Sequence, residues 1–132
     1  MCLDTVTQRY ENPDTRPAGT FWKFFERGCT GIWFPFRSDI EVVFDEWLQA
    51  HPVEVLSKNG PYVSGFHGYV TQSDALAWQN GGWSWYASLV LREVKYRGAT
   101  VKGLQDGCEV IVAQEILIPD SGSNSLDSGS PA

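Results

Sequence analysis

The chain has 132 residues, of which 42% are hydrophobic and 20% are charged, a composition typical of one globular domain and not of a disordered protein. The net charge of −6 argues against direct binding to a nucleic-acid backbone, which requires clustered Lys and Arg. The first residues lack the apolar core of a signal peptide, and no stretch reaches membrane-spanning length, so a cytoplasmic location is expected.

The first half of the chain predicts strands. Residues 1–19 are polar and interrupted by proline and glycine, so we expect an irregular lead-in there. Two aromatic-rich segments, residues 20–26 and 32–36, predict strands joined as a hairpin across a glycine-containing turn. Residues 38–51 are ambiguous, because Ser38 could cap a helix with Glu41 three residues on, whereas the β-branched and aromatic side chains of residues 40–44 favour a further strand.

The middle of the chain predicts one short helix. Residues 51–65 read as a long connection with a short strand at 53–56, because proline and an Asn-Gly-Pro break interrupt them. "GFHGYV" is then extended, and Thr71 or Ser73 can cap a helix over residues 73–80. The side chains expected on its buried side are Ala75, Leu76 and Trp78.

The last third predicts long strands and a tail. Asp106-Gly107 between apolar runs indicates a tight turn. The strands expected around it cover residues 83–97, 99–104 and 108–118. Residues 120–132 are rich in Ser and Gly and should be disordered. We therefore expect a single α+β domain over residues 20–119, a twisted and mostly antiparallel sheet with one short helix packed on it.

The three cysteines, Cys2, Cys29 and Cys108, are an odd number without a CxxC pair, and they favour free thiols in a reducing cytosol. If Met1 is removed, Cys2 becomes the N-terminal residue, and its amine could then act as a base on its own thiol. The alternative is an ordinary second residue.

Short motifs at both ends resemble small proteins of bacterial phages and prophages. These are the opening Met1-Cys2-Leu3, the segment Gly65-Phe66-His67 followed by a helix with Ala75, and two closing strands, "LVLREVKYRGATVKG" and "CEVIVAQEILI". The resemblance implies a phage or prophage accessory protein in the cytoplasm of a bacterial host. Such proteins often act by binding a host protein, in some cases against a host defence. A structural virion component is a second possibility.

Two other segments resemble the ADP-ribosyltransferase-like fold, whose members act on a nicotinamide dinucleotide. "GYVTQSDALAW" is similar to the middle motif, with Tyr69 at its aromatic position, and "GCEVIVAQEILI" is similar to the late strand, with Glu109 in place of the catalytic acid. The resemblance implies that Glu109 would stabilise the charge that develops as nicotinamide leaves. The strand "FWKFFERG" lacks the family's ribose-holding element, and His67 lies in a different segment. The only cofactor under this reading is NAD.

His67 has three possible roles. As a metal ligand it lacks companions, since His51 lies far back in the chain, so no metal is expected. As a general base it needs a partner such as Asp74 or Cys108. As a structural residue it would donate a ring N–H to a backbone carbonyl while packing between Phe66 and Tyr69. Gly65 and Gly68 would then let the backbone pass close to a neighbouring element.

The segment "NGGWSWY", residues 80–86, predicts a partner-binding loop. Flexible glycines precede Trp83, Trp85 and Tyr86, and these residue types are favoured anchors of protein interfaces. The alternative is that Trp85 and Tyr86 already belong to the following strand. Binding of a host protein is accordingly the leading interpretation, ahead of catalysis, and no phosphate-loop, dinucleotide or nucleophile-elbow motif occurs in the chain.

Overall fold

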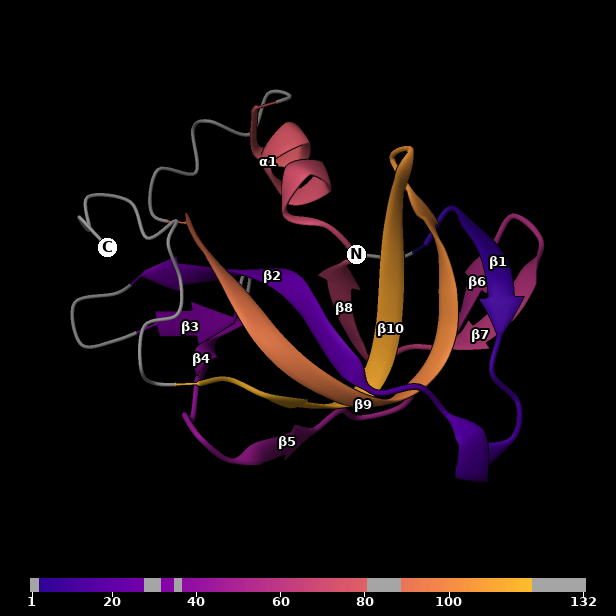
Figure 1. The fold of residues 1–132 in the computed structure, drawn as a ribbon, viewed down its shortest axis with the longest axis horizontal. Coiled ribbons are helices and arrows are strands. Elements are labelled where there is room, and N and C mark those ends of the chain that lie inside the picture. Colours follow the sequence, from indigo (N-terminus) through magenta and orange to yellow (C-terminus); the bar gives the residue numbers. More distant parts are fainter. Residues whose placement is uncertain (1–2, 28–31, 35–36, 81–88, 120–132) are drawn as a thin grey trace.

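The computed structural model describes residues 3–27, 32–34, 37–80 and 89–119, and Figure 1 shows them as a strongly curved sheet with one helix above it. Within these ranges the elements, in chain order, are β1 Thr5–Arg9, the 3₁₀ turn η1 Pro13–Thr15, β2 Gly19–Arg27, β3 Ile32–Phe34, β4 Arg37–Glu41, β5 Trp47–Gln49, β6 Glu54–Ser57, β7 Gly60–Val63, β8 Phe66–Tyr69, α1 Gln72–Asn80, β9 Leu89–Gln105 and β10 Cys108–Leu117.

One long strand organises the sheet. β9 has 17 residues, and its first part pairs with β2 while its second part pairs with β10 and β1. The strand order is β1-β9-β10-β8-β2-β3-β4, and the additional β9–β2 pairing makes β9, β10, β8 and β2 a closed circuit. β9 can pair with β2 along its first part and with β1 along its last part because its backbone is irregular near Gly98, which has a φ of 69°. The register between β9 and β10 shifts at the same place.

Alternation along the strands divides the core between the two faces of the curved sheet. On β2, Phe21 and Phe25 enter one hydrophobic cluster, and Phe24 enters the other. The first cluster lies between β2, β9 and the second half of β10, where Val94 and Ile116 are fully buried. Each such side chain contributes on the order of 1.5–3 kcal/mol through burial.

The second cluster lies beneath α1, which contacts β2, β8 and β10. Ala75 is completely buried, and Leu76 packs against the cluster. The side-chain hydroxyl of Thr71 accepts a hydrogen bond from the Asp74 N–H at 3.2 Å, as expected of a capping residue. The predicted short helix is confirmed, while the Trp78 side chain lies outside what the structure describes.

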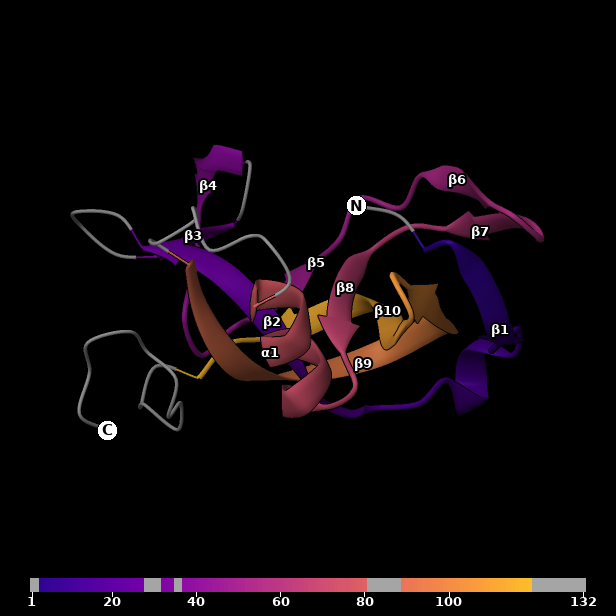
Figure 2. The ribbon, with the colours of Figure 1, turned by 90° about the horizontal axis from the view of Figure 1, so that it is seen from above.

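The β6–β7 hairpin forms a separate two-stranded sheet that lies beside β1 (Figure 2). Its connection to β1 is made by a side chain: the Asn59 amide accepts from the Val6 N–H at 2.8 Å and donates to the Val6 carbonyl at 2.6 Å. The Lys58 N–H also donates to the Asp4 carbonyl at 2.8 Å. The turn of the hairpin thus satisfies the outer edge of β1, which would otherwise present unpaired backbone groups.

Several of the expected elements are confirmed, whereas the strand expected at 40–44 lies earlier, at Arg37–Glu41. The sheet is mostly antiparallel with one short helix, the first two predicted strands pair as β2 and β3, and Asp106-Gly107 is the turn between β9 and β10. Both turn residues have positive φ, 52° and 82°, as a tight hairpin turn between strands requires.

Three expectations are wrong. The lead-in at residues 1–19 is not irregular throughout, because Thr5–Arg9 pairs with β9 and its Val6 side chain is buried. The connection at 51–65 contains the whole β6–β7 hairpin, since Asn59-Gly60 lies at a turn and not at a break. Residues 99–104 are the continuation of β9 and not a separate strand.

Residues 81–88 and the tail at 120–132 lie outside the described ranges, so the aromatic loop, the first part of the strand predicted at 83–97 and the disordered tail stay predictions. None of the helices in the described ranges is long and apolar enough to cross a membrane.

Candidate functional site

His67 lies at the centre of a directed chain of hydrogen bonds. Its Nδ1 is 3.0 Å from the Gly65 carbonyl, and because a carbonyl only accepts, Nδ1 carries the hydrogen. The other ring nitrogen, Nε2, therefore accepts from the Tyr62 hydroxyl at 3.3 Å. That hydroxyl oxygen in turn accepts from the Leu3 N–H at 2.7 Å. The chain joins the segment before β1 to β7 and β8.

The environment of His67 keeps its ring neutral at pH 7. Burial and, to a smaller extent, the nearby charge of Lys23 lower the pKa of His67 to about 4, against the opposing effect of the Gly65 hydrogen bond. Lys23 reaches from β2 and donates from Nζ to the His67 carbonyl at 3.0 Å. Burial also lowers the pKa of Lys23, to about 8.

The contacts of His67 match the structural role predicted for it. Both ring nitrogens are engaged, one with a backbone carbonyl as expected, and among the described residues neither Asp74 nor Cys108 hydrogen-bonds to the ring. A general base must reach the proton it removes with a free lone pair. The lone pair of Nε2 is instead occupied by the Tyr62 hydroxyl, so the arrangement holds the strands together.

Neighbouring strands approach the backbone at Gly65 and Gly68 so closely that glycine is required at both positions, as predicted. A Cβ at Gly68 would lie 2.2 Å from the Phe21 ring, and a Cβ at Gly65 would lie 2.5 Å from the Ala113 carbonyl oxygen. Real Cβ atoms do not approach other atoms so closely, and the neighbours are a fully buried ring and a strand backbone. Glycine at these positions lets β8 run between β2 and β10.

Tyr69 and Glu109, the other two residues suggested by the ADP-ribosyltransferase resemblance, do not converge with His67. His67 is opposite Val112 and Tyr69 is opposite Val110, so these two share a face of the sheet. Glu109 precedes Val110 on β10 and therefore points to the other face, where it is exposed and pairs with Lys102 at 3.2 Å. The three side chains line no common cleft.

Tyr69 is buried in the second core cluster and meets the Phe24 ring edge-on, with ring centroids 6.3 Å apart. Burial raises the pKa of the Tyr69 phenol, and the nearby Cys108, Asp106 and Asp74 act in the same direction. Its hydroxyl has no hydrogen-bond partner among the described residues. These surroundings are those of a core residue.

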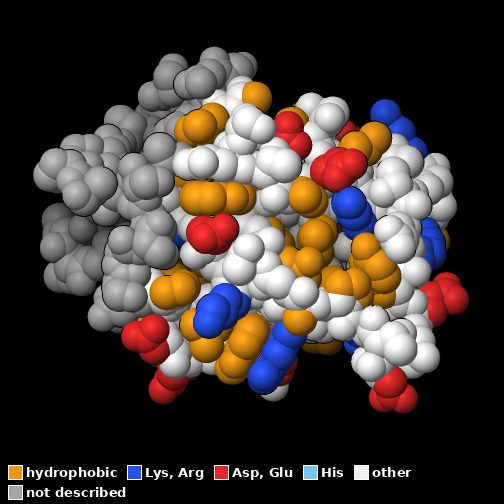
Figure 3. All heavy atoms as spheres, viewed as in Figure 1, with side chains coloured by type: hydrophobic (Ala, Val, Ile, Leu, Met, Phe, Trp, Pro, Cys, Tyr) orange, Lys and Arg blue, Asp and Glu red, His pale blue; other side chains and the backbone are white. Residues whose placement is uncertain are grey.

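No metal-binding group of three or more His, Cys, Asp or Glu side chains occurs in the described part of the chain. The predicted partner-binding residues Trp83, Trp85 and Tyr86 lie outside the described ranges, so their role stays a prediction. Figure 3 shows acidic and basic side chains interspersed among apolar ones, without a basic patch on the face it displays.

Sequence reasoning missed an exposed apolar surface on the β6–β7 hairpin. Leu56 is opposite Pro61 and Val63 is opposite Glu54, so all four side chains share the outer face. Leu56 is 76% exposed and Val63 is 41% exposed, and Val53, just before β6, is 59% exposed. We call Leu56, Pro61 and Val63, which share this face with Glu54, the hairpin face. Recognising Asn59-Gly60 as a hairpin turn would have revealed it.

Comparison with protein-family models, with curated proteins and with solved structures found no match to the chain.

Proposed function

We propose that the chain is a phage or prophage accessory protein, built on a fold that we class as α+β, which acts by binding a host protein. The observation that carries the binding role is the hairpin face, where Leu56 and Val63 are exposed on the two paired strands of the hairpin. The phage origin is supported by the sequence motifs alone.

Apolar side chains that gather on an exposed face favour association, because a partner removes them from water. Leu56 is the natural anchor of the hairpin face, since it is the most exposed of its large apolar residues. Its full burial by a partner would contribute on the order of 1.5–3 kcal/mol. A few such anchors supply most of the binding energy in protein interfaces.

The hairpin is held in place before any partner arrives, which lowers the entropic cost of binding. Asn59 attaches the turn to β1, and the Arg9 guanidinium donates to the Pro61 carbonyl at 2.6 Å. Tyr62, on the inner side, is buried and hydrogen-bonded to the Leu3 N–H. The net charge of −6 favours a partner with basic residues around its contact surface.

Binding accounts for the site better than catalysis does. The His67 ring has both nitrogens engaged, and Glu109 lies on the opposite face of the sheet. The ADP-ribosyltransferase mechanism needs those groups around one ligand, and this geometry gives it no support.

The test is quantitative capture from host lysate by the intact chain and by matched variants. Leu56→Asp should abolish recovery of the partner, while Val43→Asp should retain it, because Val43 is 43% exposed and lies outside the hairpin face. Both variants should keep the thermal stability of the parent within a few degrees, since exposed substitutions change stability by about 0.5 kcal/mol or less.

Equal recovery with Leu56→Asp would refute the hairpin face as the contact surface. A Trp83→Ala, Trp85→Ala double variant tests the aromatic loop in the same assay, and unchanged recovery would remove the loop from the proposal. A stable homo-oligomer with no captured partner would instead favour a structural virion component. Phage genes beside the coding sequence would support the proposed origin.

A further inference from the structure

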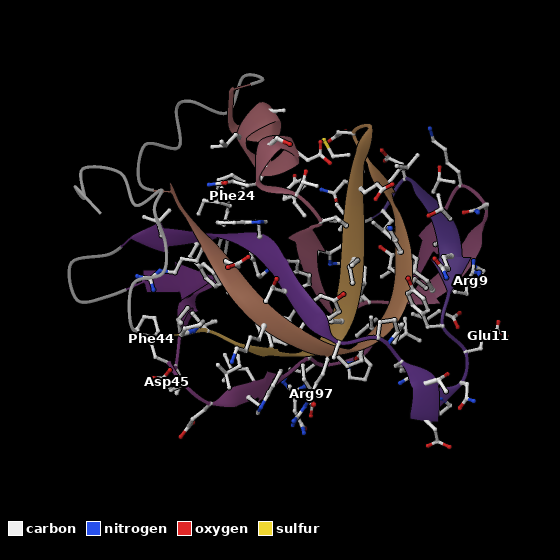
Figure 4. The ribbon with its side chains drawn as sticks, viewed as in Figure 1. Arg9, Glu11, Phe24, Phe44, Asp45 and Arg97 are labelled. Atoms are coloured by element: carbon white, nitrogen blue, oxygen red, sulfur yellow. The ribbon has the colours of Figure 1, made fainter. Side chains whose placement is uncertain are left out.

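A charged hollow lies beside the hairpin face, between the end of β1, the segment leading to β2, and β7. Its volume is about 210 Å³, and the residues that matter to its chemistry are Arg9, Glu11, Arg16, Glu54, Tyr62 and Val63. Figure 4 shows the side chains of Arg9 and Glu11 close to the same edge of the molecule, beside the hairpin. Two arginines and two glutamates thus line the same hollow.

These four charged groups do not pair with one another. No ion pair joins any of them within the described part of the chain, and Arg9 donates instead to the Pro61 carbonyl at 2.6 Å. The Nε of Arg16 is buried and has no hydrogen-bond acceptor among the described residues. A buried polar atom without a partner is uncommon in native proteins and calls for a ligand, a water molecule or another explanation.

The signs of the charges restrict the ligand. A simple anion would be attracted by the two arginines, Arg9 and Arg16, and repelled by the two glutamates, Glu11 and Glu54. A simple cation would be attracted by the glutamates and repelled by the arginines. A molecule that carries both signs satisfies both pairs at once. Tyr62 and Val63 are the other two of these residues that line the hollow.

The size restricts the ligand further. A hollow of about 210 Å³ holds roughly seven water molecules at about 30 Å³ each. It lies below the range of about 300–1,000 Å³ typical of sites for drug-sized ligands and cofactors. A ligand the size of a small metabolite therefore fits the hollow.

We infer that this hollow binds a small zwitterion of the free amino-acid type. Its carboxylate would pair with the guanidinium groups of Arg9 and Arg16, and its ammonium group with the carboxylates of Glu54 and Glu11. Its side chain would lie against Val63 and the Tyr62 ring. The hollow shares Val63 with the hairpin face, but it is complete within the purified chain, so its ligand can be tested without the proposed protein partner.

The experiment is titration of the purified full-length chain with the twenty common free amino acids, followed by calorimetry or by NMR of the amide resonances. At least one amino acid should bind with a dissociation constant of ~1 mM or tighter and shift the resonances of Arg9, Tyr62 and Val63. Its analogues that lack either the amino or the carboxyl group should bind at least ~10-fold more weakly, since each loses one charge-assisted interaction.

Substitutions of the lining residues test whether the amino acid binds in this hollow. Arg16→Met and Glu54→Gln should each weaken binding at least ~10-fold, and Glu46→Gln is the matched control, because Glu46 is an exposed carboxylate that does not line the hollow. Glu54 is also exposed, so its variant is expected to fold even if the Arg16 variant does not.

The inference would be overturned if none of the amino acids bound at ~10 mM, a concentration about ten times the dissociation constant expected here. Equal binding of the analogue without an amino group would also overturn it and indicate a simple anion site. Retained affinity in Glu54→Gln would have the same consequence. Because no host protein is present, a negative result here leaves the hairpin-face proposal standing.

Discussion

The buried, neutral His67 predicts a specific loss of stability in acid. Its pKa is about 4 in the folded chain, against about 6.5 for an unperturbed histidine. Between these pH values the unfolded chain binds a proton that the folded chain does not. The contribution of neutral His67 to stability is therefore fully present above pH 6.5 and is lost progressively as the pH falls towards 4.

The magnitude follows from the size of the pKa difference. A difference between 6.5 and about 4 corresponds to about 3 kcal/mol well below pH 4, at about 1.4 kcal/mol per pKa unit. At pH 4.5 most of this loss, about 2–3 kcal/mol, is already present. That is a large share of the roughly 5–15 kcal/mol that stabilises a typical domain.

The assay is urea unfolding at pH 7.5 and at pH 4.5 for the parent and for His67→Leu, whose side chain cannot titrate. At pH 7.5 the variant should be less stable by about 1–3 kcal/mol, because the Tyr62 hydroxyl loses its acceptor and the Gly65 carbonyl loses its donor. Between the two pH values the parent should lose about 2–3 kcal/mol more than the variant.

His51→Leu is the matched control, because His51 is exposed and lies outside the hydrogen-bond chain of His67. It should show the same pH dependence as the parent. Equal losses in the parent and in His67→Leu, to within about 0.5 kcal/mol, would refute the assignment of His67 as a neutral, buried residue.

Two further predictions concern the contacts that set the fold. Gly68→Ala should lower the free energy of unfolding by about 1–3 kcal/mol, because the added methyl would meet the Phe21 ring. If urea unfolding showed no such loss, β2 and β8 would not be this close. Asn59→Ala should cost about 1–3 kcal/mol and speed hydrogen exchange of the Val6 amide, whereas an unchanged exchange rate would contradict the bond to β1. Lys58→Ala, which leaves its backbone N–H in place, is the control for the second.

The sequence predicted the elements whose signals are local. α1 is fixed by the Thr71 cap and by Ala75 on its buried side, and the β9–β10 turn by the positive φ that Asp106-Gly107 tolerates. The close approach at Gly68 was also predictable, since a glycine between large residues on a strand indicates a neighbouring backbone or ring.

Other features depend on pairings between distant segments, which no local pattern encodes. β1 reads as irregular because its polar residues are exposed, yet Thr5–Arg9 pairs with the end of β9, about a hundred positions later. The register of β8 on β10 is equally non-local, and it decides that Glu109 faces away from His67. Two motifs that look compatible in the sequence are thereby separated by the sheet.

The sequence by itself determined a sheet-dominated chain with one capped helix, because capping, turn chemistry and alternation act over a few residues. Only the tertiary structure decided which side chains meet. The pairing of the strands around β9 placed His67 against Tyr62, on the inner side of the β6–β7 hairpin. Leu56, on the outer side of that hairpin, remained exposed to solvent. Each strand has two faces, and only packing against distant strands determines which of them water reaches.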